Sequence, residues 1–147
     1  RHIEWPIVIM LAAMIPIGQA LESTGITALI ATEVVSLAGD LHIFWILMII
    51  LIITMLITDV INNAATAVIM APFSVNIALQ LGQPLEPFLM VVAVGASCAF
   101  LTPIGHQCNT LVMGPGNYKF SDYWRLGLPL DILIVLASIP MILFVWL

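Results

Sequence analysis

The stretch Thr58-Asp59-Val60-Ile61-Asn62-Asn63-Ala64-Ala65-Thr66 decides the fold, because it places polar side chains in the middle of a long apolar run. That run covers residues 41–81. As a single helix it would be about 60 Å long, which is roughly twice the hydrocarbon thickness of a bilayer. The chain must therefore turn at or near Asn62 and Asn63. The turn lies either in water between two spans or at the tip of a re-entrant hairpin that stops inside the membrane.

A second polar stretch repeats this pattern, Thr102-Pro103-Ile104-Gly105-His106-Gln107-Cys108-Asn109-Thr110, after an apolar segment over 85–101. The next apolar piece, 109–113, is too short to span a bilayer alone. The pattern therefore favours a broken helix over 85–113, in which Pro103 interrupts the helix and Gly105 allows close backbone approach. Irregular backbone at membrane depth survives only in a cavity or inside protein, and it marks ion and substrate sites in secondary transporters.

Composition restricts the class of protein. Of 147 residues, 63% are hydrophobic and only 7% are charged, whereas a soluble domain carries about 25% charged residues. The chain is therefore predicted to be an integral membrane protein. Nucleic-acid binding is not expected, because the three basic residues, Arg1, Lys119 and Arg125, are scattered. The net charge of −5 identifies no partner, since many of the carboxylates lie at segment ends.

The whole chain, 1–147, is predicted to be one all-α polytopic transmembrane domain. Other expected features are a first span over 5–21, a short packed helix over 26–37, a turn at 82–84, a surface loop over 119–125, and a last span over 126–147 broken at its two prolines. The sequence begins at Arg1 without a Met and ends inside an apolar run. We therefore expect a piece of a longer polypeptide.

The first polar stretch has a functional and a structural interpretation. Thr58 and Asn63 offer oxygens that suit Na⁺, and a helix N-terminus offers free N–H groups to an anion. A polar turn in headgroup water explains the same residues equally well. Asp59 could balance a cation or carry a proton, but it could also cap a helix, and we favour the structural role.

The second polar stretch leaves similar alternatives. His106 could contact an anion or titrate with pH, although a single His is more often a hydrogen-bonded core residue, and the same holds for Gln107. No second His lies nearby, which argues against a metal site. An intramembrane hydrolase would need Ser97 or Cys108 as nucleophile with His106 as base. No orienting third group is visible, so an enzyme is not expected.

Together these motifs resemble the C-terminal half of the divalent anion/sodium symporter family, within the ion transporter superfamily. That family carries a Ser-Asn-Thr motif at the tip of a re-entrant hairpin in each of two inverted repeats, and Asn62-Asn63-Ala64 is similar to the second copy. Pro103, Gly105 and Asn109 match its broken-helix loop, in which His106-Gln107-Cys108 replaces Thr-Pro-Pro. The segments 15–25 and 114–130 resemble two further family segments. The Gly-His-Gln-x-Asn form resembles the permease branch that is often linked to sulfate.

The resemblance implies an elevator-type symporter for a divalent anion, sulfate or a dicarboxylate, with Na⁺ as the coupling ion and no other cofactor. It implies a Na⁺ site at Thr58, Asn63 and the carbonyls of Ile61 and Gly105. The implied anion ligands are Asn62, Asn63, Ala64, His106, Gln107 and Asn109. The implied partners are the N-terminal repeat of the same polypeptide and a second copy, in the bilayer of the cell membrane. The alternative within the superfamily is an arsenite- or proton-coupled antiporter, in which Asp59 or His106 carries protons.

Overall fold

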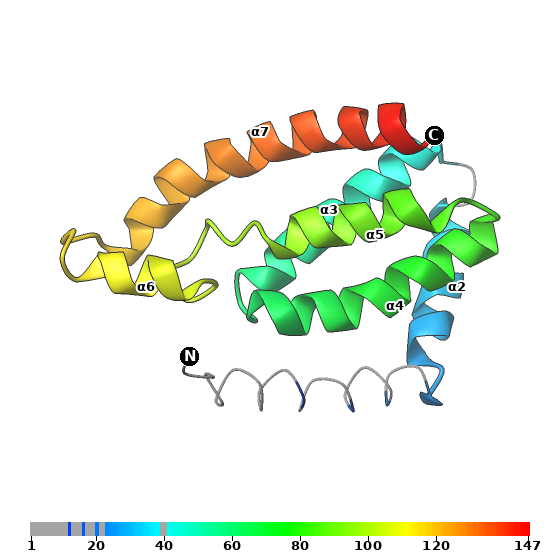
Figure 1. The fold of residues 1–147 in the computed structure, drawn as a ribbon, viewed down its shortest axis with the longest axis horizontal. Coiled ribbons are helices and arrows are strands. Elements are labelled where there is room, and N and C mark those ends of the chain that lie inside the picture. Colours follow the sequence, from blue (N-terminus) through cyan, green and yellow to red (C-terminus); the bar gives the residue numbers. More distant parts are fainter. Residues whose placement is uncertain (1–11, 13–15, 17–19, 21–22, 39–40) are drawn as a thin grey trace, which may run out of the picture.

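The structure is a computed structural model, and it describes residues 12, 16, 20, 23–38 and 41–147. Within these residues it is all-helical and has no strand, which confirms the predicted all-α class (Figure 1). The expected first span over 5–21 lies almost entirely outside the described residues. The described helices are α2 (Ile26–Ala38), α3 (Ile43–Thr58), α4 (Asn63–Leu81), α5 (Leu85–Ala96), α6 (Gln107–Met113) and α7 (Phe120–Trp146).

The long apolar run folds into two helices, α3 and α4, joined by a short tip over 59–62. The chain turns there because Asn62 adopts an extended conformation and caps α4, its side chain accepting the N–H of Ala65. The predicted turn near Asn62 is therefore confirmed. At its other end α4 stops at Gly82, whose φ of 63° favours glycine, and Pro84 precedes α5. The turn predicted at 82–84 is also confirmed.

The chain between α5 and α6 is non-helical over 97–106, longer than the sequence predicted. We expected the first piece to reach Leu101 and the second to begin at Asn109, but α5 ends at Ala96 and α6 begins at Gln107. The N–H of Leu101 binds the side chain of Asp59 rather than a helical carbonyl. His106 caps α6, its Nδ1 accepting the N–H of Cys108, and this sets the helix start.

The last helix, α7, begins earlier than predicted and is not interrupted. The segment 119–125, expected as a surface loop, instead contributes the first turns of the helix, so that expectation is wrong. A capping box explains the difference, because the side chain of Asp122 accepts the N–H of Lys119 at 2.8 Å. The helix also continues through Pro129 and Pro140. Prolines are tolerated in helices of membrane proteins, where neighbouring groups satisfy the freed carbonyls.

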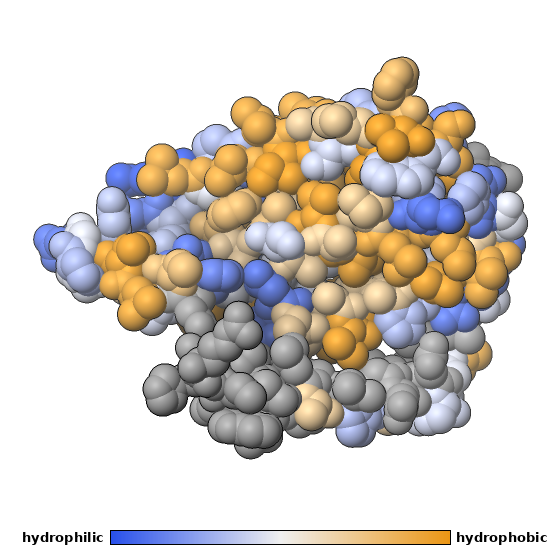
Figure 2. All heavy atoms as spheres, in the orientation of Figure 1, coloured by the Kyte–Doolittle hydropathy of each residue, from blue (hydrophilic) through white to orange (hydrophobic). Residues whose placement is uncertain are grey.

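The centre of the fold is α5, which packs against α3, α4 and α7, while α2 packs on α4 (Figure 1). A hydroxyl joins two of these helices, as Ser74 on α4 donates to the carbonyl of Phe88 on α5 at 3.0 Å. Much of the outer surface is apolar, including the face over α7 (Figure 2). Among the described residues, α4 and α7 are long and apolar enough to cross a membrane. This pattern is that of a membrane protein.

The close approach of α3 and α5 depends on Gly95. A methyl group added at this position would lie 2.9 Å from Cβ of Thr54 and 3.2 Å from Leu51. Both neighbours are buried side chains of α3. We therefore expect Gly95→Ala to destabilise the fold by about 1–3 kcal/mol, the usual cost of overpacking a core. Thermal unfolding of the full-length protein in detergent measures this. The exposed Ala93 on the same helix supplies the control, Ala93→Leu, and equal midpoints for the two variants would contradict the prediction.

Candidate ion and anion site

An oxygen-rich cluster lies where the α3–α4 tip meets the C-terminal end of α5. The hydroxyl oxygen of Thr58 lies 2.9 Å from Oδ1 of Asn63 and 3.0 Å from the carbonyl oxygen of Ala96. Thr58 is fully buried. Its single hydroxyl hydrogen can serve only one of the two acceptors at a time, so three oxygens share one hydrogen. Hard cations take such oxygen ligands, so the donor set suits a Na⁺ ion.

The broken-helix loop contacts the backbone beside this cluster through Gly105. A Cβ at Gly105 would lie 2.9 Å from the carbonyl oxygen of Thr58, 3.0 Å from Cα of Asp59 and 2.9 Å from Cβ of Ala99. The glycine backbone therefore rests directly on the tip. The structure brings together three of the four residues predicted for Na⁺, namely Thr58, Asn63 and Gly105. The fourth, Ile61, lies in the same tip and bonds through its N–H to the carbonyl of Ile57 at 2.8 Å.

Asp59 fastens the tip to the loop. Its Oδ1 accepts the N–H of Leu101 at 3.0 Å, and its carbonyl accepts the hydroxyl of Thr102. The same hydroxyl accepts the N–H of Gly105 at 3.1 Å. A continuous chain of hydrogen bonds thus runs from Asp59 through Thr102 to the glycine. These contacts agree with the structural role favoured for Asp59.

The residues predicted to face the anion divide between the two segments. Asn62 uses its side-chain oxygen to cap α4 at 2.9 Å from the N–H of Ala65, and Ala64 is partly buried in the first turn of that helix. His106 is exposed and caps α6. Gln107 begins α6, and its side chain is not among those described.

Asn109 holds the broken-helix loop in place. Its amide nitrogen donates to the carbonyl oxygens of Ala99 at 2.8 Å and Thr102 at 3.2 Å. Its own carbonyl accepts the hydroxyl of Tyr123, on α7, at 2.7 Å. Asn109 therefore ties the loop to α6 and, through Tyr123, to the last helix.

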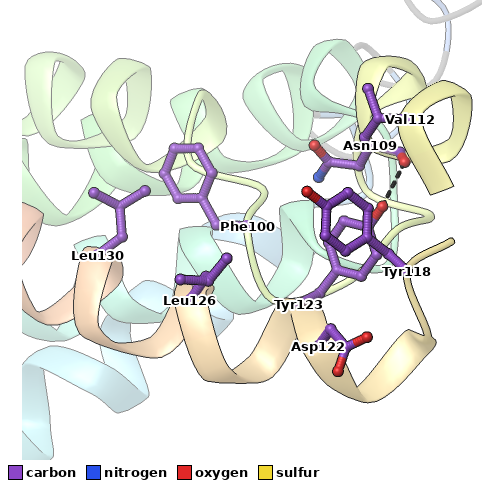
Figure 3. Close-up of a pocket in the computed structure, with 9 residues that line it drawn as sticks. Phe100, Asn109, Val112, Tyr118, Asp122, Tyr123, Leu126 and Leu130 are labelled. Carbon is purple, nitrogen blue, oxygen red and sulfur yellow. Dashed lines mark hydrogen bonds between the residues drawn. The ribbon is translucent and has the colours of Figure 1, made fainter. Parts of the chain in front are cut away.

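A cavity of about 210 Å³ opens beside Asn109, between α6 and α7 (Figure 3). Its wall is mostly apolar and aromatic, and the rings of Tyr118 and Tyr123 meet edge to face with centroids 6.3 Å apart. Thr58, Asn63 and Gly105 do not line it. The candidate site is therefore assigned from the oxygen ligands of the cluster and not from this cavity.

Sequence reasoning missed two contributors to the site. The carbonyl of Ala96 is a backbone group, and no side chain signals its position. Thr102 stood in the second polar stretch, but its bond to the carbonyl of Asp59 joins residues 43 positions apart. For the Ala96 carbonyl, the small residues at 95–97 were the available signal. For Thr102, nothing in the sequence indicated that its hydroxyl binds the carbonyl of Asp59.

Comparison with known proteins identifies the family of this chain. The model of the citrate transporter family matches residues 1–147. A protein named uncharacterized transporter from Synechocystis sp. is 37% identical over 144 residues, which are 98% of this chain and 24% of the relative. The uncharacterized transporter YfbS of Escherichia coli is 39% identical over 142 residues, 97% of this chain and 23% of the relative.

A more distant relative is the sodium/sulfate cotransporter 2 of Chlamydomonas reinhardtii, which is 28% identical over 139 residues, covering 94% of this chain and 16% of the relative. This chain thus spans about a quarter, or less, of the length of these three relatives. The matches point to a transporter rather than an enzyme. The chain belongs to the citrate transporter family of membrane transporters, and the predicted kinship with the ion transporter superfamily is confirmed.

Proposed function

We propose that this chain supplies one Na⁺ site and half of the anion site of a Na⁺-coupled symporter for a divalent anion. The observation that carries the proposal is the cluster of Thr58 Oγ1, Asn63 Oδ1 and the Ala96 carbonyl, with the Gly105 backbone against the neighbouring Thr58 carbonyl. Na⁺ would bind to these oxygens, and the Thr58 hydroxyl would keep its hydrogen and turn it away from the ion. The carbonyls of Ile61 and Gly105 are the proposed remaining ligands.

The anion is proposed to bind at the start of α4, next to the cation. Asn62 occupies the N–H groups of Ala65 and Thr66. The N–H groups of Asn63 and Ala64 precede them and have no carbonyl within the helix to bind. A helix N-terminus stabilises negative charge, and a bound Na⁺ adds to that effect. Binding of the anion and the cation would thus favour each other, which is the basis of symport.

On the other side of the anion we propose His106, Gln107 and Asn109. Relatives named sodium/sulfate cotransporters support sulfate as the anion. The name of the matching family supports a carboxylate, so a dicarboxylate stands beside sulfate. The remaining ligands would come from the N-terminal repeat of the same polypeptide. A homodimer in the cell membrane is the proposed assembly.

The lengths of α3 and α5 support a tip that lies inside the membrane, although α4, the second arm of the hairpin, is long enough to cross it. At 1.5 Å per residue, α3 is about 24 Å long and α5 about 18 Å long, whereas the hydrocarbon core is about 30 Å thick. Both helices end at the oxygen cluster, which would then lie inside the membrane. The hydrogen bonds of Asp59 and Thr102 fasten the hairpin to the broken helix, so the two would move as one block.

Uptake by the full-length transporter in proteoliposomes tests this function. Labelled sulfate, succinate and citrate are compared with and without an inward Na⁺ gradient. Accumulation of sulfate or succinate that requires the gradient supports the proposal, and the preferred anion identifies the substrate. Uptake that ignores Na⁺ but depends steeply on pH would replace the proposal with the proton-coupled antiporter.

A further inference from the structure

Asp131 is a buried acidic residue that the Na⁺ and anion sites do not use. It lies on α7 with only 8% of its surface exposed, and its Oδ1 has no hydrogen-bond partner among the described residues. It lines a cavity of about 280 Å³ between α3 and α7. The rest of the lining is apolar: Ile52, Met55, Leu56, Leu101, Leu128, Ile132, Val135 and Leu136.

Of the described groups near Asp131 on the neighbouring segments, one acid adds to the cost of a negative charge there and none offers a positive charge. From the end of α3 comes Asp59, which is also buried and has one oxygen, Oδ2, without a partner in the described part of the chain. From the end of α5 comes Cys98, a buried neutral thiol. Both lie close enough to interact electrostatically with Asp131. The two described basic residues, Lys119 and Arg125, are exposed near the start of α7.

A shared backbone segment connects Asp131 to the candidate site. Gly127 lies one turn before Asp131 on α7, and a Cβ there would lie 3.1 Å from the nitrogen of Leu101. That nitrogen donates to Asp59, while the side chain of Leu101 lines the cavity with Asp131. Leu101 thus contacts Asp59 through its N–H and shares a cavity wall with Asp131.

We propose that Asp131 is a proton-binding site at the contact between α7 and the hairpin. An ionised carboxylate in an apolar cavity without a cationic partner is very costly, and a second carboxylate nearby adds to that cost. A proton removes the charge and needs no further ligands. A metal ion would need several oxygens, and the other residues that line this cavity are apolar. The proposal does not depend on the Na⁺ site or on the identity of the anion.

The bound proton controls how α7 packs on α3. With Asp131 neutral, the cavity wall is uniformly uncharged and the two helices can stay in contact. When Asp131 loses the proton, its charge draws water into the cavity and loosens the contact. Transport therefore falls as pH rises through the titration of Asp131, by roughly tenfold for each pH unit above the midpoint.

The first test is chemical labelling of the full-length wild-type transporter with a hydrophobic carbodiimide, dicyclohexylcarbodiimide. The Asp131 oxygen adds to the central carbon of the reagent and the carboxyl proton passes to its nitrogen, so no group leaves and only the protonated acid reacts. Mass spectrometry should find the adduct on Asp131, with a yield that falls as pH is raised. Absence of the adduct at every pH would overturn the proposal, as expected if a basic side chain from elsewhere in the protein neutralises Asp131.

The second test is the pH profile of uptake. Asp131→Asn resembles the protonated acid and cannot ionise. It should keep its uptake at alkaline pH, where the wild type loses it. Glu86, exposed in the first turn of α5, supplies the control, since Glu86→Gln removes an acid of similar chemistry and should leave the wild-type profile unchanged. Identical profiles for Asp131→Asn and the wild type would overturn the coupling of this proton to transport. If the variant is not produced, the labelling of the wild type decides.

Discussion

Replacing Asn63 with alanine is expected to abolish Na⁺-driven anion uptake by the full-length transporter. The substitution removes Oδ1, one of the three oxygens that share a single hydrogen at the candidate site. A lost contact to a charged group costs about 1.5–3 kcal/mol, which corresponds to roughly a 10- to 100-fold loss of affinity. The half-saturating Na⁺ concentration should rise accordingly, and uptake at moderate Na⁺ should vanish. Uptake measured over a series of Na⁺ concentrations gives this value.

Asn76 provides a matched control on the same helix. It is partly buried like Asn63, but its amide donates to the carbonyl of Pro72 on its own helix, at 2.8 Å. Asn76→Ala should therefore leave the Na⁺ dependence unchanged. If both variants show the wild-type dependence, the assignment of Asn63 to the cation is wrong. If both lose uptake together with their thermal stability, α4 has been disrupted and the loss says nothing specific about Na⁺.

The sequence predicted the parts of the site that depend on local chemistry. Asn62 and Asn63 inside an apolar run required a turn, and a turn there brings Thr58 and Asn63 to opposite sides of one tip. Their hydrogen bond joins residues only five positions apart. In the same way, Pro103 and Gly105 required a break, and a break of that kind needs a neighbour to cover its backbone groups. Local patterns therefore indicated both halves of the site.

The remaining parts could not be predicted because backbone groups from distant segments form them. The bond from Leu101 to Asp59 joins residues 42 positions apart, and its donor is a main-chain N–H that every non-proline residue carries. The Ala96 carbonyl is likewise a backbone group, and no residue type indicates its position. The start of α7 was misjudged for a different reason. The polar composition of 119–125 resembles a loop, but Asp122 lies at the position where an acidic side chain caps the helix.

The hydrogen bonds from Asp59 through Thr102 to Gly105 combine a predictable part with an unpredictable one. Polar residues in each segment were visible in the sequence, yet the function proposed for them depends on how closely the segments approach each other. Thr102 sets that approach by accepting the N–H of Gly105 while donating to the tip. The residue that allows the approach is the glycine itself, because it has no side chain to separate the loop from Thr58.

Gly105→Ala is therefore expected to have an effect as large as that of Asn63→Ala. The added methyl group would lie 2.9 Å from the Thr58 carbonyl oxygen and 3.0 Å from Cα of Asp59. Both are backbone atoms, so no side chain can rotate to make room, and the loop must move away from the tip. This overpacking costs about 1–3 kcal/mol, and it separates the proposed Gly105 ligand from the other oxygens. Uptake should be lost at Na⁺ concentrations that saturate the wild type.

Gly114→Ala is the control for Gly105→Ala. Gly114 closes α6, and the described residues leave room for a methyl group there. A Cβ at Gly114 would meet no atom of the described residues within 4 Å, and its φ of −68° is suitable for alanine. Gly114→Ala should thus transport like the wild type, while Gly105→Ala should not. Normal Na⁺-driven uptake by Gly105→Ala would mean that the loop does not rest on the tip in the working transporter. The Na⁺ site would then have to be sought away from Gly105, since a backbone ligand displaced by a methyl group could no longer reach the ion.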